Sequence, residues 1–255
     1  MKILISNDDG ITAPGLNALL QPFKNAGHEI VVVAPTHENS ASSHAITVHD
    51  PIFVCEHKFT DPQIKGWSVG GRPADCVKIA LEVLLKDDLP ELVISGINAG
   101  SNLGLDTMYS GTVNAALEAS MHDIPAIAVS LNSRASDADY SVAVEYALKI
   151  TQDYMNFALP KSTMLNVNVP GVAKEDIKGI RLTKLGDVWY DNVFSPRQDL
   201  RGRTYYWLGG EIVLNTVCNI EYDVDAVNQN WVTVTPLHYD LTDKESFEKL
   251  KKLNF

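Results

Sequence analysis

Over the first 170 residues of the chain, short and mostly apolar runs alternate with longer segments in which apolar residues recur at helical spacing. Residues 2–6 and 29–34 are bounded by turn residues, which predicts two buried strands. Between them, apolar side chains recur at positions 16, 19, 20 and 23, the i, i+3, i+4, i+7 spacing of a helix that ends at Gly27. The same reasoning predicts strands at 92–95, 126–130 and 164–169, and helices at 74–85, 112–121 and 140–155.

This alternation predicts the fold class. Strands that are separated by helices pair in parallel through right-handed crossovers. We therefore expect an α/β fold, with a mostly parallel sheet flanked by helices.

The pattern changes after about residue 180. The segment 186–203 is polar and aromatic, and residues 205–207 and 231–235 resemble strands without an intervening helix. We expect residues 1–180 to form the catalytic core, and residues 181–255 to form a β-rich C-terminal hairpin arm with elements that return to the core. Exposed aromatic residues on such an arm commonly mark a protein interface, the alternative being a satellite hydrophobic cluster on its own domain. These aromatic residues are Trp189, Tyr190, Tyr205, Tyr206 and Trp207.

Composition narrows the classes of function. The 255 residues are 45% hydrophobic, which suffices for one sizeable core, and their formal net charge is −11. This charge disfavours nucleic-acid polymers and acidic membrane surfaces as partners. The three cysteines form no CxxC pair, so they indicate no zinc site and fit a reducing compartment. With no signal-peptide pattern and no membrane-spanning apolar stretch, we expect a cytoplasmic protein.

The most informative motif is Asn7-Asp8-Asp9-Gly10, directly after the first strand. Two adjacent carboxylates raise each other's pKa unless a cation lies between them. Hard divalent cations prefer oxygen ligands, and ligands of open α/β sheets bind at the carboxyl ends of the strands. The motif therefore predicts a metal site, although an Asx turn with a positive φ at Gly10 explains it equally well.

Two further segments offer phosphate sites. The loop 95–104 is rich in glycine, so its backbone N–H groups, including that of Gly96, can approach a phosphate. It lacks the lysine of an ATP-type loop and does not follow the first strand as a dinucleotide fingerprint does. Ser110, Gly111 and Thr112 open a helix and form a second candidate, in which Ser110 also reads as a simple N-cap. We add Asn7 to the predicted phosphate contacts.

The expected topology brings these segments together. The strand ends at 6–9, 34–40 and 95–98 should converge on one crevice, beside the turn at 110–112. The predicted ligands there are Asp8, Asp9, Ser40 and Asn98. All four offer oxygen atoms, which fits one Mg²⁺ or Mn²⁺ ion better than zinc. We expect Asp8, Asp9 and Asn98 to take part in catalysis.

Several motifs resemble those of the SurE family, the survival proteins that act as metal-dependent nucleotidases. The matching segments are residues 3–10, 33–35 with Ser40, 71–77, 95–100, 109–113 and 233–237. The resemblance implies a Rossmann-like core, a divalent metal ion held by Asp8, Asp9, Ser40 and Asn98, and hydrolysis of nucleoside 5′-monophosphates. Activity on 3′-monophosphates and short polyphosphate is a further expectation. The resemblance also implies a homodimer or homotetramer with an exchanged arm. Ala41 departs from the family, which often has glycine after the serine.

The expected reaction is phosphate monoester hydrolysis by a metal-activated water, with Asp8 or Asp9 available as proton acceptor. An aspartyl-phosphate route is disfavoured, because phosphatases of that type use Asp-x-Asp. His44 is either an auxiliary base or substrate contact or, more simply, an exposed loop histidine without a role. A signalling receiver domain is a rival interpretation, but no Lys-Pro element follows Asp50 at the required place. A nucleotide-binding regulatory protein without turnover remains the alternative, since it needs the same loops.

Overall fold

The protein is described by a computed structural model that covers residues 1–157, 159–160, 162–187, 189–190, 193–210, 212–213 and 218–253. Its main feature is a nine-stranded sheet with the order β3-β4-β2-β1-β5-β6-β7-β13-β8. The strands are β1 (Lys2–Ser6), β2 (Glu29–Pro35), β3 (Val54–Glu56), β4 (Lys65–Val69), β5 (Leu92–Ala99), β6 (Ala126–Asn132), β7 (Thr163–Pro170), β8 (Gly179–Leu182) and β13 (Trp231–His238). Six neighbouring pairs are parallel, and only β3–β4 and β7–β13 are antiparallel.

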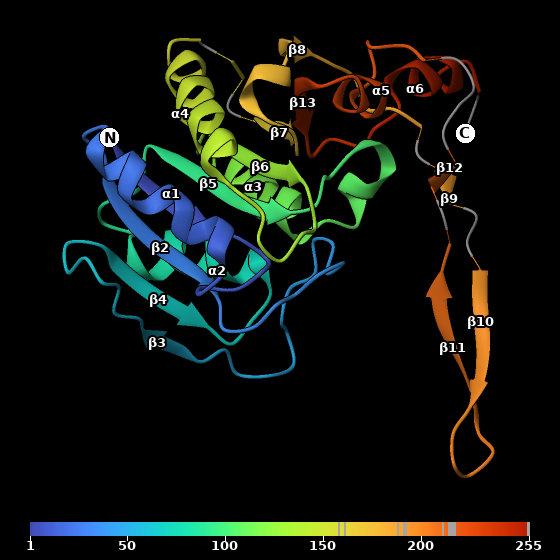
Figure 1. Ribbon diagram of the computed structural model, residues 1–255, viewed down its shortest axis with the longest axis horizontal. Coiled ribbons are helices and arrows are strands. Elements are labelled where there is room, and N and C mark those ends of the chain that lie inside the picture. The colour runs from blue at the N-terminus through green and yellow to red at the C-terminus, as the bar shows by residue number, and fades with distance from the viewer. Residues whose placement is uncertain are drawn as a thin grey trace.

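Helices cover both faces of this sheet (Figure 1). On one face, α1 (Pro14–Asn25) and α4 (Ser141–Met155) pack on side chains such as Ile3 and Val32. On the other, α2 (Pro73–Ile79) and α3 (Gly111–Met121) pack on alternate residues such as Leu4. Because successive strand residues point to opposite faces, one apolar run supplies both cores. The expected α/β class and Rossmann-like arrangement are confirmed.

The structure corrects several predicted boundaries. The predicted helix 74–85 ends at Ile79 and continues as a π-helical turn, Ala80–Leu84. Strand β5 extends four residues beyond Ser95, with a register shift between Ser95 and Asn98, so the glycine-rich segment begins inside a strand. Strands β3 and β4 and the helix α6 (Lys244–Leu250) were not predicted. Short 3₁₀ turns form at Gly104–Met108 and Lys174–Asp176.

An antiparallel hairpin projects from the body of the protein (Figure 1). It consists of β10 (Val193–Gln198) and β11 (Thr204–Gly209), with the short pair β9 (Trp189–Tyr190) and β12 (Ile212–Val213) at its base. Tyr205, Tyr206 and Trp207 are exposed on β11, so they form no satellite core. The side chains of Trp189 and Tyr190 lie outside the described part of the chain.

The prediction that no helix separates residues 205–207 from residues 231–235 is wrong. Helix α5 (Asp223–Asn228) lies between the arm and the last strand, and β13 pairs with β7 in the main sheet. The extended run in β13 resembled an arm strand because sequence spacing does not reveal its pairing partner. The division into residues 1–180 and 181–255 stays a prediction. In the described part of the chain, no helix combines the length and the apolarity needed to span a bilayer.

Candidate active site

The turn after β1 is built by Asn7. Its amide oxygen accepts from the N–H of Gly10 at 3.1 Å, and its amide nitrogen donates to the carbonyl of Gly10 at 2.9 Å. Gly10 has φ +102°, a conformation that favours glycine. The expected Asx-type turn is therefore present, and it does not exclude a metal site at Asp8 and Asp9. Both polar groups of Asn7 are engaged in the turn, and its phosphate contact stays a prediction.

The two carboxylates that follow are electrostatically unfavourable when both are ionised. Asp8 is only 5% exposed, and burial raises its pKa, although the hydroxyl of Thr112 donates to Oδ1. Burial and then the charge of Asp8 raise the pKa of Asp9 to about 6. One oxygen of Asp9 accepts from the N–H of Ala99 at 3.3 Å. A cation beside this pair would relieve both the desolvation and the repulsion.

The structure brings all four predicted metal ligands to one cleft of about 580 Å³ at the carboxyl edge of the sheet. Asp8 and Asp9 follow β1, Ser40 follows β2, and Asn98 lies near the end of β5. The hydroxyl of Ser40 donates to Glu38 Oε1 at 2.6 Å, and the amide nitrogen of Asn98 donates to the carbonyl of Gly100 at 2.8 Å. The Asn98 amide oxygen accepts no hydrogen bond from the described residues.

Of the predicted phosphate contacts, Ser110 lines the cleft, whereas Gly96 and Thr112 do not. Ser110 lines the cleft as the N-cap of α3, where its hydroxyl accepts from the N–H of Val113 at 3.1 Å. Thr112 is fully buried and bonded to Asp8. Gly96 does not line the cleft, because it lies within β5, where an added Cβ would stand 2.2 Å from the carbonyl oxygen of Val129. The glycine-rich segment therefore begins inside a strand, and the phosphate contact of Gly96 stays a prediction.

Gly111 lies in close contact with Asp8 and Ser42. A Cβ at this position would lie 2.7 Å from both Asp8 Cβ and Ser42 Oγ. The hydroxyl of Ser42 is buried and has no hydrogen-bond partner among the described residues. The glycine therefore lets the start of α3 pack directly against Asp8 and Ser42, and the unsatisfied hydroxyl of Ser42 remains available to a polar group that is not part of the chain.

The donor chemistry fits a hard divalent cation. The predicted set comprises two carboxylates, one hydroxyl and one amide oxygen, and no sulfur or imidazole. Within the described ranges, no three histidine, cysteine, aspartate or glutamate residues cluster as a metal site. A cation here would therefore depend on Ser40 and Asn98 as well as on the two aspartates.

The sequence did not single out several residues of the cleft. Glu38, Asp106, Tyr109 and Arg134 line it, together with Ser101 and Asn102. Asn102 anchors the loop after β5, since its backbone N–H donates to Asn168 Oδ1 at 2.8 Å and its amide donates to the Ser130 hydroxyl at 2.8 Å. The rule that ligands bind at the carboxyl ends of strands applies to Arg134 too, because it follows β6.

His44 lies in a neighbouring pocket and not in the cleft. Its Nε2 is 2.7 Å from a carboxylate oxygen of Glu118, which is only 5% exposed and also contacts Lys78 and His122. Burial would raise the pKa of Glu118, but the hydrogen bond and charge of His44, with Lys78, hold it below the ordinary value. His44 therefore ties the Ser40 loop to α3 and is only partly exposed, and its role as a base or substrate contact stays a prediction.

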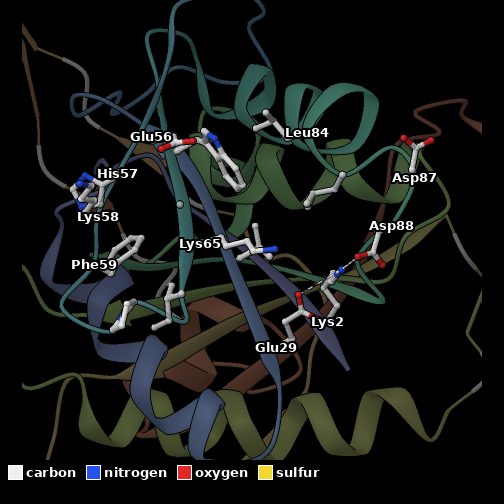
Figure 2. Close-up of a pocket in the computed structure, with 16 residues that line it drawn as sticks. Lys2, Glu29, Glu56, His57, Lys58, Phe59, Lys65, Leu84, Asp87 and Asp88 are labelled. Atoms are coloured by element: carbon white, nitrogen blue, oxygen red, sulfur yellow. Dashed lines mark hydrogen bonds and ion pairs between the residues drawn. The ribbon is translucent and has the colours of Figure 1, made fainter.

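A larger hollow, of about 760 Å³, lies on a different part of the sheet (Figure 2). It adjoins the first residues of three strands, Lys2, Glu29 and Lys65. Lys2 forms ion pairs with Glu29 and Asp88, as Figure 2 shows. This is the amino-terminal edge of the parallel strands, whereas ligands of open α/β sheets bind at the carboxyl ends. We therefore place the candidate active site in the smaller cleft.

Comparisons with known proteins identify the family of the chain. The family model described as "Survival protein SurE" matches residues 3–192. A protein of Alkaliphilus metalliredigens named "5'-nucleotidase SurE" is 46% identical over 254 residues, which cover 100% of this chain and 99% of the relative. A protein of the same name from Heliobacterium modesticaldum is 49% identical, covering 95% of this chain and 88% of the relative. The solved SurE protein from Aquifex aeolicus superposes with a TM-score of 0.84 at 36% identity, covering 98% of each chain.

Proposed function

This chain belongs to the SurE family, and we propose that it is a metal-dependent 5′-nucleotidase that hydrolyses nucleoside monophosphates to nucleoside and phosphate. Full-length relatives named as 5′-nucleotidases support the reaction class. One observation carries the assignment to this site. Four oxygen-bearing side chains from three strand ends, Asp8, Asp9, Ser40 and Asn98, line a single cleft.

In this proposal the four side chains hold one Mg²⁺ or Mn²⁺ ion per subunit. When bound, such an ion neutralises charge on phosphoryl oxygens and lowers the pKa of a coordinated water. Asn98 would contribute its amide oxygen, since its amide nitrogen is already bonded to Gly100. The hydroxyl of Thr112 donates a hydrogen bond to Asp8 Oδ1 and so fixes the orientation of this carboxylate. Asp9, with one oxygen bonded to Ala99, keeps the other oxygen to accept a proton from the attacking water.

The amino-terminal end of α3 would bind the phosphate. Helix starts leave unpaired N–H groups and a partial positive charge that favour anions. Ser110 lines the cleft at this point, and Gly111 lets the start of α3 approach Asp8 and Ser42 closely. These groups suffice for one phosphoryl group, and the protein's net charge of −11 disfavours a more highly charged ligand.

We expect nucleoside monophosphates to be cleaved in preference to ATP. The measurement is phosphate release with Mn²⁺ or Mg²⁺ across AMP, GMP, CMP, UMP, 3′-AMP, ATP and short-chain polyphosphate. Loose base selectivity is expected, because the sequence shows no dedicated base-reading motif. ATP as the best substrate would overturn the one-phosphate site. Tight nucleotide binding without phosphate release would instead favour the second candidate, a regulatory nucleotide-binding protein that uses the same loops.

We further propose that the hairpin arm joins subunits into a homodimer or homotetramer. Tyr206 and Trp207 on β11 are 62% and 66% exposed, which is unfavourable for large aromatic side chains in water. Exchange of an identical element between subunits is an accessible route to such an assembly. Multi-angle light scattering should give at least twice the 28.0 kDa chain mass at micromolar concentration. A monomer under these conditions would contradict the proposal.

A further inference from the structure

The candidate cleft has an uneven distribution of charge. Four carboxylates line it, those of Asp8, Asp9, Glu38 and Asp106. Among the described residues that line the cleft, Arg134 alone carries a positive side chain. A phosphate monoester that enters this cleft meets repulsion from the acidic side chains, and a single metal ion offsets only part of it. Among the described residues that line the cleft, Arg134 is therefore the side chain that can attract an anionic ligand.

Arg134 is placed by the carboxyl end of β6 and by Gly100. The N–H of Gly100 donates to the carbonyl of Leu131 at 2.9 Å, which ties the loop after β5 to the end of β6. The Arg134 side chain crosses Gly100, because its Nε and Cγ lie 2.9 Å and 3.4 Å from where a Cβ of Gly100 would be. Gly100 also has φ +110°, so glycine is favoured there twice, by conformation and by the arginine above it.

The guanidinium of Arg134 is not engaged by any of the residues that the structure describes. It makes no hydrogen bond or ion pair with the described part of the chain, although it shares the cleft with four carboxylates. Other arginines of the body are engaged, as Arg72 donates to Asn39 and Arg181 donates to the carbonyl of Ile220. An arginine that crosses the loop next to Asn98 but ion-pairs with none of the nearby acids keeps its fork of N–H donors available for a ligand.

We propose that Arg134 is a substrate-binding residue that contacts the phosphoryl group of the nucleotide. The guanidinium fork matches two phosphate oxygens, and such charge-assisted pairs are stronger than neutral hydrogen bonds. Ribose and base carry no negative charge, so they gain less from the same contact. This inference rests on the proposed nucleotidase function, and it adds a ligand-recognition residue outside the predicted set.

The contact is made to the bound phosphate before and after hydrolysis, so it lowers KM and also retains inorganic phosphate. In Arg134→Ala we expect the KM for AMP to rise about 10–100-fold, the range for a lost hydrogen bond to a charged group, with kcat changed by less than about threefold. The dissociation constant for inorganic phosphate in the presence of Mn²⁺, measured by calorimetry, should rise in parallel. Arg134→Lys should fall between wild type and Arg134→Ala, because lysine keeps the charge but not the bidentate geometry.

Lys86→Ala is the matched control, because it also removes one positive charge, from an exposed residue that does not line the cleft. It should leave KM and phosphate affinity unchanged. Wild-type KM and phosphate affinity in Arg134→Ala, or equal losses in Arg134→Ala and Lys86→Ala, would overturn the inference. The two proposals fail differently. A wild type that releases no phosphate refutes the nucleotidase function, while phosphate affinity still tests Arg134.

Discussion

Replacing Asp9 with asparagine should reduce phosphate release from AMP by at least about 100-fold, while the metal-free protein keeps or gains thermal stability. The variant loses a charged metal ligand and a proton acceptor. It also removes the repulsion that, together with burial, raises the pKa of Asp9 to about 6. A residue that served only the fold would show the opposite pattern, with lower stability and a proportionate loss of activity.

The stability effect has a defined direction with pH. Because the pKa of Asp9 is higher in the folded protein than in an unfolded chain, the native state holds the proton more tightly. Its contribution to stability is complete below the ordinary carboxyl pKa and is lost as the pH rises through about 6. In chelator at pH 7.5, Asp9→Asn should thus be more stable than wild type. Asp9 is partly exposed, so the gain is about 1 kcal/mol, or roughly 2–4 °C.

Thermal unfolding in chelator at pH 7.5 and 5.5 measures this effect, and the gain should shrink at the lower pH. Asp87→Asn is the control, since Asp87 is an exposed carboxylate that does not line the cleft. Near-normal turnover of Asp9→Asn in chelator would show that the metal assignment is wrong. So would an Asp9→Asn protein that melts several degrees below wild type without metal while Asp87→Asn does not.

Gly111→Ala should be nearly inactive although one methyl group is the only change. The added Cβ would lie 2.7 Å from Asp8 Cβ and from Ser42 Oγ, closer than carbon and oxygen atoms pack, so the carboxylate must move. A displacement of about 1 Å at a catalytic group can reduce rates about 100-fold. Gly111 begins α3, where alanine is a better helix former than glycine, so the helix itself is not disfavoured.

The measurement is kcat/KM for AMP, with circular dichroism to confirm the fold. Gly70→Ala is the matched control, because the nearest atoms to its added Cβ are at 3.6 Å or more and Gly70 does not line the cleft. We expect wild-type kinetics from Gly70→Ala. Wild-type kinetics from Gly111→Ala would mean that the close packing of α3 on Asp8 does not position this carboxylate for the reaction.

Much of the site was predictable because parallel strands end at one edge. Asp8, Asp9, Ser40 and Asn98 are separated by up to 90 residues in the sequence, yet the expected convergence of the strand ends places them in one cleft. Most helices and strands of the first 170 residues were equally visible, since each buries an apolar face. Strands β3 and β4 were not, and β3 is exposed along its length. Less of the C-terminal part could be predicted from the sequence. The extended run of β13 does not reveal that it pairs with β7.

Other features could not be read from residue types. Gly96 suggested a phosphate loop, but the segment is a buried strand beside Val129, and strand pairing is decided by neighbours far away in the sequence. Both ends of the Asn7 amide are hydrogen-bonded to Gly10, a structural role that the residue type alone does not show, and its phosphate contact stays a prediction. Arg134 lies in an exposed loop without periodicity, so only the folded chain shows that it crosses Gly100.

The most direct test of the account is phosphate release from AMP by protein freed of metal with chelator and then titrated with Mn²⁺. We predict no release in chelator, full recovery on adding Mn²⁺ to wild type, and no recovery in Asp9→Asn at the same metal concentrations. Undiminished release in the presence of chelator, or equal recovery in the variant, would contradict a metal site at Asp8 and Asp9.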